Sequence, residues 1–336
     1  MTQITTISEF LLQAGTEYRI FDMGRGIVSL PEQTFLELEQ GLRPAPRPRQ
    51  QHAWFGVLFW NKQLSHQHYI WFIKLPLDER GLLQLAARQQ FLQTVVDALG
   101  QQLEQAEKHH GQLPENPYCF IPNQQQLANF NAISRRTLGL QASEHINLAV
   151  TYLSAPALQD WRQISLQGIA ELAIYCLDEP TCMMDQFGLL ASEVQDALLN
   201  AWENHLLPVP IADYLMAWYR QQPFSLQREQ QILRAFSQTA HTEMISLISQ
   251  ILTREDINQD TLILLAARHW LQFASPDNAQ RLLEAISKVS PELFPPLFAD
   301  LVQIPTTRSA MLSVLRSPDK SPALTQAIGG LFGQTS

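Results

Sequence analysis

Residues 54–75, WFGVLFWNKQLSHQHYIWFIKL, hold two aromatic and β-branched runs separated by a polar stretch. The runs are Trp54 to Trp60 and Tyr69 to Leu75, and each has the length and composition of a β-strand. Apolar residues follow one another in both runs, so we expect both faces of these strands to be largely covered. The stretch therefore predicts a β-hairpin inside a folded domain.

Further short elements flank this hairpin. Tyr18 to Asp22 and Ile27 to Leu30 are β-prone runs around Gly24-Arg25-Gly26, and glycine supplies the positive φ of a hairpin turn. Apolar residues at helical spacing predict a long helix from Asp78 to Gln105. We also predict helices at Glu32–Gln40 and Gln124–Leu138, and a strand at Tyr118–Ile121. Together these elements predict a small mixed α/β domain over residues 1–142.

The second part of the chain shows no strand pattern after residue 143, and helix starts recur instead. Ser192 with Gln195 three residues later fits a capping box. Breaks recur every 15 to 19 residues, near Pro210, Ser225, His241, Ile257, Pro276, Pro291, Thr306 and Pro322. Taken in pairs, such helices give a repeat of roughly 31 residues, near the range of helical solenoids. We predict an α+β protein in which residues 143–336 form a HEAT-like solenoid or an irregular helical array.

The cysteine count and the hydropathy pattern point to a compartment. The chain has three cysteines, Cys119, Cys176 and Cys182. A small and odd number of cysteines argues against a disulfide framework and favours a reducing environment. Residues Met1 to Phe10 lack the basic start and apolar run of a secretion signal. No apolar stretch approaches the roughly 20 residues that span a bilayer. We therefore expect a cytoplasmic protein without a membrane segment.

The net charge of −9 comes from one segment. Residues 1–142 and 214–336 each hold equal numbers of basic and acidic residues, whereas residues 143–213 hold ten acids and one basic residue, Arg162. Such a field attracts basic partners and repels a phosphate backbone, so nucleic-acid binding is not expected. A solvated face that aids solubility is the plain alternative. The candidate docking residues are Asp178, Glu179, Asp185, Glu193, Asp196 and Glu203.

The densest carboxylate cluster is Leu177-Asp178-Glu179-Pro180, followed by Asp185. Its three acids suit a divalent cation, although the glycine and spacing of a calcium loop are missing. With His145 or His205 brought near by folding, they would suit a metal-assisted hydrolase. The structural alternative is that Asp178 caps a helix whose first turn holds Glu179 and Pro180.

The cysteine spacing does not add a metal ligand set to this cluster. Cys176 and Cys182 lie six residues apart, and no second cysteine pair completes a zinc site. Both fit the pattern of small buried hydrophobic residues. We therefore predict no metal site and no cofactor.

An arginine-proline segment, Gly41 to Gln51, separates the first helix from the aromatic hairpin. Arg43, Arg47 and Arg49 alternate there with prolines, which favours a loop or polyproline conformation. The guanidinium groups suit a carboxylate or phosphate partner, or the acidic helices of this same chain. A solvated linker is the plain alternative.

Leu177-Asp178-Glu179, together with the chain length, resembles a family of uncharacterised gammaproteobacterial proteins of about 340 residues that carry a Leu-Asp-Glu motif. The resemblance covers nearly the whole chain. It implies a bacterial cytoplasmic setting, and no activity, cofactor or catalytic residue is carried over with it.

The leading hypothesis is a non-enzymatic interaction or scaffold protein. Its acidic helices, residues 143–213, would dock a partner with a basic surface, since helical arrays present extended surfaces. The metal-assisted hydrolase around Asp178 is the alternative. The sequence does not fix the oligomeric state.

Overall fold

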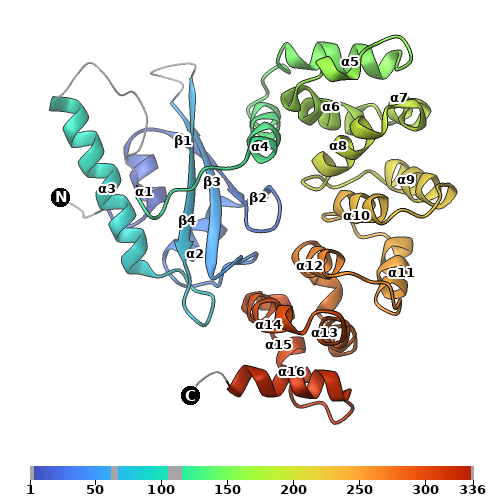
Figure 1. Ribbon diagram of the computed structural model, residues 1–336. Helices are drawn as coiled ribbons and strands as arrows, with labels where there is room; N and C mark the ends of the chain where they lie inside the picture. Colours follow the sequence, from blue (N-terminus) through green and yellow to red (C-terminus); the bar gives the residue numbers. More distant parts are fainter. Residues whose placement is uncertain (1–3, 62–66, 105–115, 334–336) are drawn as a thin grey trace. The chain divides into compact units, whose positions relative to one another are not determined.

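The computed structural model describes residues 4–61, 67–104 and 116–333 and confirms the α+β class: a small antiparallel sheet precedes a long series of helices (Figure 1). Contacts divide the chain into two compact units. Unit 1 is Met1–Ile121 with Ala299–Ser309, and unit 2 is Pro122–Phe298 with Ala310–Ser336. The division into a mixed α/β domain of residues 1–142 and an all-helical domain of residues 143–336 stays a prediction.

Unit 1 contains a four-stranded antiparallel sheet in the order β2-β1-β3-β4. The strands are β1 (Glu17–Asp22), β2 (Val28–Leu30), β3 (His52–Trp60) and β4 (His68–Pro76). β3 pairs with β4 from His52 opposite Pro76 to Trp60 opposite His68, which confirms the predicted aromatic hairpin. β1 pairs with β2 across the turn at Gly26, whose φ is +124°, which confirms the second hairpin.

One face of the sheet packs against three helices, α1 (Ile7–Gln13), α2 (Glu32–Glu39) and α3 (Leu85–Glu104). Figure 1 shows α1 and α3 on the same side of the strands. Alternate residues of β3 point into this core, as the two-residue period of a strand requires. The core includes Ile7, Leu11, Phe35, Leu38, Phe55, Val57, Ile73, Leu75, Phe91 and Leu92.

The predicted helix from Asp78 to Gln105 begins seven residues late, at Leu85. The Asp78 carboxylate accepts hydrogen bonds from the backbone N–H groups of Arg80 and Leu82, both at 2.8 Å, and so fixes a turn. Gly81 completes that turn with a φ of +80°. α3 ends at Glu104, and Gln105 lies outside the described residues. At the predicted strand 118–121, Cys119 forms an isolated bridge with Ile73.

The helices of unit 2 begin with α4 (Gln124–Thr137), close to the predicted range. Those that follow are α5 (His145–Ser154), α6 (Leu166–Asp178), α7 (Pro180–Gln186), α8 (Ser192–Trp202), α9 (Val209–Gln221), α10 (Leu226–Ala235), α11 (Thr242–Ile251), α12 (Gln259–Arg268), α13 (Pro276–Val289), α14 (Phe294–Gln303), α15 (Pro305–Val314) and α16 (Pro322–Gly333). Four short 3-10 turns lie between them, at Trp161–Gln163, Phe187–Leu189, Trp270–Phe273 and Pro291–Leu293. The contacts that assign 299–309 to unit 1 divide α14 and α15 between the units. Among the described helices, none is long and apolar enough to cross a membrane.

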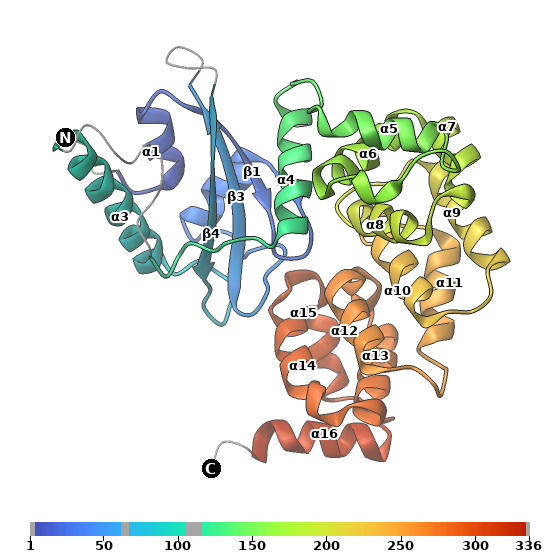
Figure 2. The same ribbon diagram turned by 45° about the horizontal axis from the view of Figure 1, so that its top comes forward.

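Alternate helices of unit 2 pack side by side, in the order α4, α6, α8, α10 and α12 (Figure 2). Hydrogen bonds join positions 31 residues apart along this row: Gln227 to Asp196 at 2.6 Å, and Gln230 to Thr261 at 3.2 Å. The spacing agrees with the repeat of roughly 31 residues expected from the breaks. The fully buried Trp202 anchors α8 to α6 through a 3.0 Å bond from its Nε1 to the Ala173 carbonyl.

The predicted capping box at Ser192 is wrong. α8 begins at Ser192, its N-cap is Ala191, and no side chain caps it. Gln195 is buried instead and donates from Nε2 to the Phe187 carbonyl at 2.8 Å. The Gln195 side chain therefore ties α8 to the preceding turn.

Candidate functional site

Asp178 is the last residue of α6, and its carboxylate accepts a hydrogen bond from Arg136 Nη2 of α4 at 2.7 Å. The interpretation of Asp178 as a helix cap is therefore wrong. Glu179 is the N-cap of α7, without a side-chain bond, and Pro180 opens that helix as expected. Arg136 and Asp178 both line a cavity of about 210 Å³ between α4 and α6.

Other acids of segment 143–213 are also engaged within unit 2. Glu203, only 14% exposed, binds Arg234 at 3.0 Å and Arg268 at 2.7 Å. The buried Glu171 accepts from the backbone N–H of Ser143 at 2.9 Å. Ion pairs also hold Asp160 to Arg162 and Glu171 to Arg135, and Asp213 forms a 2.9 Å hydrogen bond with His241 Nε2. Half of the segment's acids thus have a basic neighbour in the fold.

Five acids of the segment bond to no basic side chain within the described residues. Glu179, Asp185, Glu193 and Asp196 follow one another from the end of α6 to the first turns of α8 and are here called the acidic surface. The fifth, Glu144, is exposed at the start of α5. Glu179, Asp185 and Glu193 are exposed, and no basic group in the described parts of the chain forms an ion pair with them. Asp196 is half-buried and accepts from Gln227, and burial raises the pKa of its carboxyl. Leu189 stands between Asp185 and Glu193 with 69% of its surface exposed.

The carboxylates of Asp178, Glu179 and Asp185 do not converge. Within residues 4–61, 67–104 and 116–333, no three His, Cys, Asp or Glu side chains gather as a metal site would require. Burial, with Arg136 nearby, lowers the pKa of His205 to about 4, so its imidazole is neutral at physiological pH. The hydrolase alternative gains no support from this geometry.

The arginine-proline segment lies folded within unit 1, which the solvated-linker interpretation did not anticipate. Ala45 is buried, and its N–H donates to the Gly81 carbonyl at 2.9 Å. Arg43 is exposed, and its Nη1 forms an ion pair with Glu37 Oε2 at 3.4 Å. The Arg49 guanidinium stacks 3.9 Å from the centre of the Trp54 ring, whose Nε1 donates to the Arg49 carbonyl.

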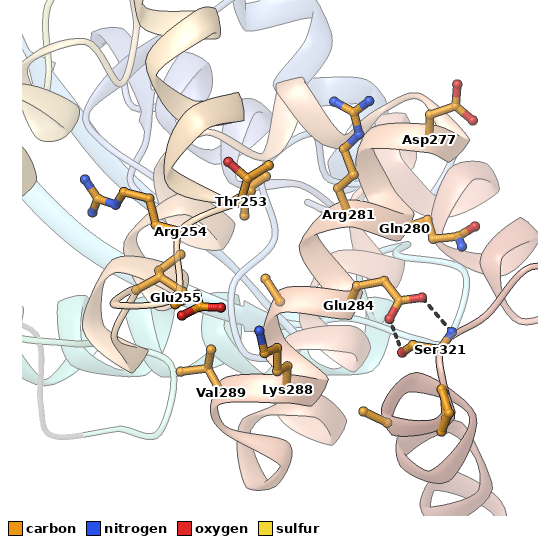
Figure 3. Close-up of a pocket in the computed structure, with 15 residues that line it drawn as sticks. Thr253, Arg254, Glu255, Asp277, Gln280, Arg281, Glu284, Lys288, Val289 and Ser321 are labelled. Carbon is orange, nitrogen blue, oxygen red and sulfur yellow. Dashed lines mark hydrogen bonds between the residues drawn. The ribbon is translucent and has the colours of Figure 1, made fainter.

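Sequence reasoning missed a groove of about 950 Å³ over α13, here called the α13 groove (Figure 3). The α11–α12 loop, Leu252 to Ile257, and the start of α16 form its sides. Arg254 fixes the loop through two 2.7 Å bonds to the buried Glu229. Glu284 fixes α16 by accepting from both the backbone N–H and the hydroxyl of Ser321.

The groove also holds charges of both signs that form no ion pair within the described residues. Arg281 and Lys288 lie on either side of Glu284 along α13 (Figure 3), and acidic Asp277 and Glu255 also line the space. A groove with both signs in similar number selects neither an anionic nor a cationic ligand by charge. Its residues come from three separated segments, so no local sequence signal identifies it.

The fold and these surfaces define an α+β protein with a small antiparallel sheet and a stacked-helix part. The model of the family described as "Protein of unknown function (DUF3549)" matches residues 2–332, and the chain belongs to this family. This confirms the resemblance to a domain family of unknown function that spans nearly the whole chain. Searches of curated proteins and of solved structures gave no match.

Proposed function

We propose that this chain is a non-enzymatic interaction protein whose acidic surface docks a partner with a basic surface. The supporting observation is that Glu179, Asp185 and Glu193 are exposed and bond to no basic side chain in the described residues, while five other acids of the same segment do. An uncompensated field of one sign raises the local concentration of an oppositely charged partner.

Leu189, which lies between Asp185 and Glu193 in the sequence and is 69% exposed, is the apolar contact that we propose for this surface. Binding energy concentrates in a few desolvated apolar contacts, whereas charges at the rim govern encounter rate and orientation. The partner that fits is a basic segment with one apolar residue directed at Leu189.

The packing of alternate helices supports a scaffold role of the HEAT-like kind, because stacked repeats present extended surfaces. The cytoplasmic setting expected from the three cysteines belongs to the same proposal; all three thiols are free. Asp178 and Glu203 are left out of the proposed docking residues, because each already forms an ion pair with an arginine of unit 2.

The test compares two variants that change the net charge equally. Glu179→Lys/Asp185→Lys/Glu193→Lys reverses the acidic surface, and Asp260→Lys/Glu292→Lys/Asp319→Lys reverses three exposed acids elsewhere in unit 2. Each tagged protein is purified from its native cell extract at low and at moderate salt. A stoichiometric partner held by the wild type and the control, and lost by the first variant and by raised salt, supports the proposal. Equal capture by all three proteins, or no partner for the wild type at low salt, overturns it.

The α13 groove favours ligand binding as a second candidate function, because both of its sides are fixed by buried or bonded charges before any ligand arrives. Its volume of about 950 Å³ falls in the range of small-molecule sites. The check is a thermal-shift screen of zwitterionic metabolites against the wild type and Arg281→Glu/Lys288→Glu. A compound that stabilises both proteins equally does not bind here.

A further inference from the structure

The arginine-proline loop, residues 43–49, lies directly on the turn between β1 and β2. A Cβ at Gly24 would overlap the carbonyl oxygen of Arg47, so the two backbones approach as closely as a glycine allows. Arg25, which is 1% exposed, donates from Nε to the Pro48 carbonyl at 2.9 Å. The loop therefore covers the end of β1.

A carboxyl group lies beneath this contact. Asp22, the last residue of β1, is 4% exposed, and its Oδ1 accepts from the Gly24 N–H at 2.9 Å. The charged groups that face it are Arg47 from the loop and Arg25 from the turn. Arg25 also forms an ion pair with Asp300, so its charge is shared with a second carboxylate.

Burial dominates the electrostatics of this cluster. It raises the pKa of Asp22 to about 7, although the Gly24 N–H, Arg47 and Arg25 all act to lower it. A carboxyl that returns to water regains a pKa near its ordinary value of about 4. The covered state of Asp22 therefore holds its proton more tightly than the uncovered state.

We propose that Asp22 is a proton-controlled latch that closes the arginine-proline loop over the β1–β2 turn. With a proton on Asp22, the loop packs over a neutral group. Without the proton, the carboxylate gains by hydration when the loop lifts, and Arg47 is carried into solvent with it. By linkage, closure is fully stable below the uncovered pKa and weakens as pH rises through the covered pKa.

Hydrogen exchange measures this equilibrium at two amides of the loop. The Ala45 N–H bonds to Gly81 and the Arg49 N–H bonds to His52 at 3.0 Å, so both exchange when the loop lifts. After correction for intrinsic rates, we expect their protection in the wild type to fall at least about tenfold between about pH 5 and about pH 8. Asp22→Asn, which imitates the protonated form, keeps the higher protection at both values.

Two further variants make the test decisive. Glu39→Gln removes another buried carboxyl, one that caps α1 through Ile7 and Ser8, and should keep the wild-type fall. Arg47→Gln removes an attractive charge, so the pH at the midpoint of the fall should rise; this variant serves alone if Asp22→Asn does not fold. Protection that is equal at both pH values in the wild type, or a midpoint unmoved by Arg47→Gln, overturns the latch.

Discussion

The Arg136 guanidinium of α4 and the Asp178 carboxylate of α6 form a 2.7 Å ion pair between residues 42 positions apart. Asp178 belongs to the densest acidic cluster of the sequence, yet its charge is balanced by a neighbouring helix. The fold thus divides the acids of segment 143–213 into an internally paired set and an exposed set. The proposed function rests on the exposed set.

The Asp178 pair contributes little to stability, because its side chains are 56% and 51% exposed and solvent screens them. We expect Asp178→Ala to lower the free energy of unfolding by less than about 1 kcal/mol. Urea denaturation at low and at high salt measures this. A larger loss that persists at high salt would show that the pair is structural.

The Arg254–Glu229 pair behaves differently, because the Glu229 side chain is 1% exposed and accepts two bonds of 2.7 Å. Removing the arginine leaves the buried Glu229 carboxylate uncompensated, so Arg254→Ala should cost about 3–5 kcal/mol. Asp256→Ala is the matched control, since Asp256 pairs with the same arginine but is 66% exposed. Denaturant unfolding of both variants checks the prediction, and equal losses would contradict it.

The two-residue turn before β3 carries backbone strain. Gln50 and Gln51 have φ values of +49° and +60°, a region that glycine and asparagine adopt more readily. The flanking Arg49 and His52 exchange two 3.0 Å backbone hydrogen bonds, as in a type I′ hairpin. We expect Gln50→Asn/Gln51→Gly to stabilise the protein by about 1 kcal/mol, measured by thermal unfolding. The reverse exchange of Gly26 for alanine should destabilise it.

The stability of the chain should also depend on pH through Asp22. Its folded pKa of about 7 lies above the ordinary value, so its contribution is fully present below about pH 4 and is lost as pH rises through 7. Asp22→Asn removes the cost of a buried charge and should gain on the order of 2–4 kcal/mol over the wild type near pH 8, with little or no gain near pH 4. The difference between the two proteins is the quantity to measure.

That difference matters because other groups titrate in the same range. Burial also raises the pKa of Glu39, to about 6, which acts in the same direction as Asp22. Burial lowers the pKa of His205 and His269 to about 4, so their contribution is lost as pH falls. If Asp22 were an ordinary paired carboxylate, Asp22→Asn would destabilise the protein at pH 8 instead.

Features with local causes could be predicted from the sequence. The aromatic runs and Gly26 specify two hairpins. The break expected near Pro276 is the start of α13, where the Ser275 side chain accepts from the Asn278 N–H. The start of α3 could not be predicted, because Asp78 competes with the helix by bonding its own downstream backbone.

The candidate site depended on contacts between distant positions. A charge count along the chain identifies the acidic segment, but the partners of Glu203 lie 31 and 65 residues away. Stacking of alternate helices brings them together, and no local pattern encodes that. The α13 groove and the cover over Asp22 were missed for the same reason.

The most direct test of docking at the acidic surface is the dissociation constant of the captured partner. It is measured at low salt for the wild type, for Glu179→Lys/Asp185→Lys/Glu193→Lys, and for the equally charged control Asp260→Lys/Glu292→Lys/Asp319→Lys. We predict affinity at least about tenfold weaker for the first variant, wild-type affinity for the control, and loss of the difference as salt rises. Equal weakening in both variants would contradict docking at the acidic surface and leave net charge as the cause.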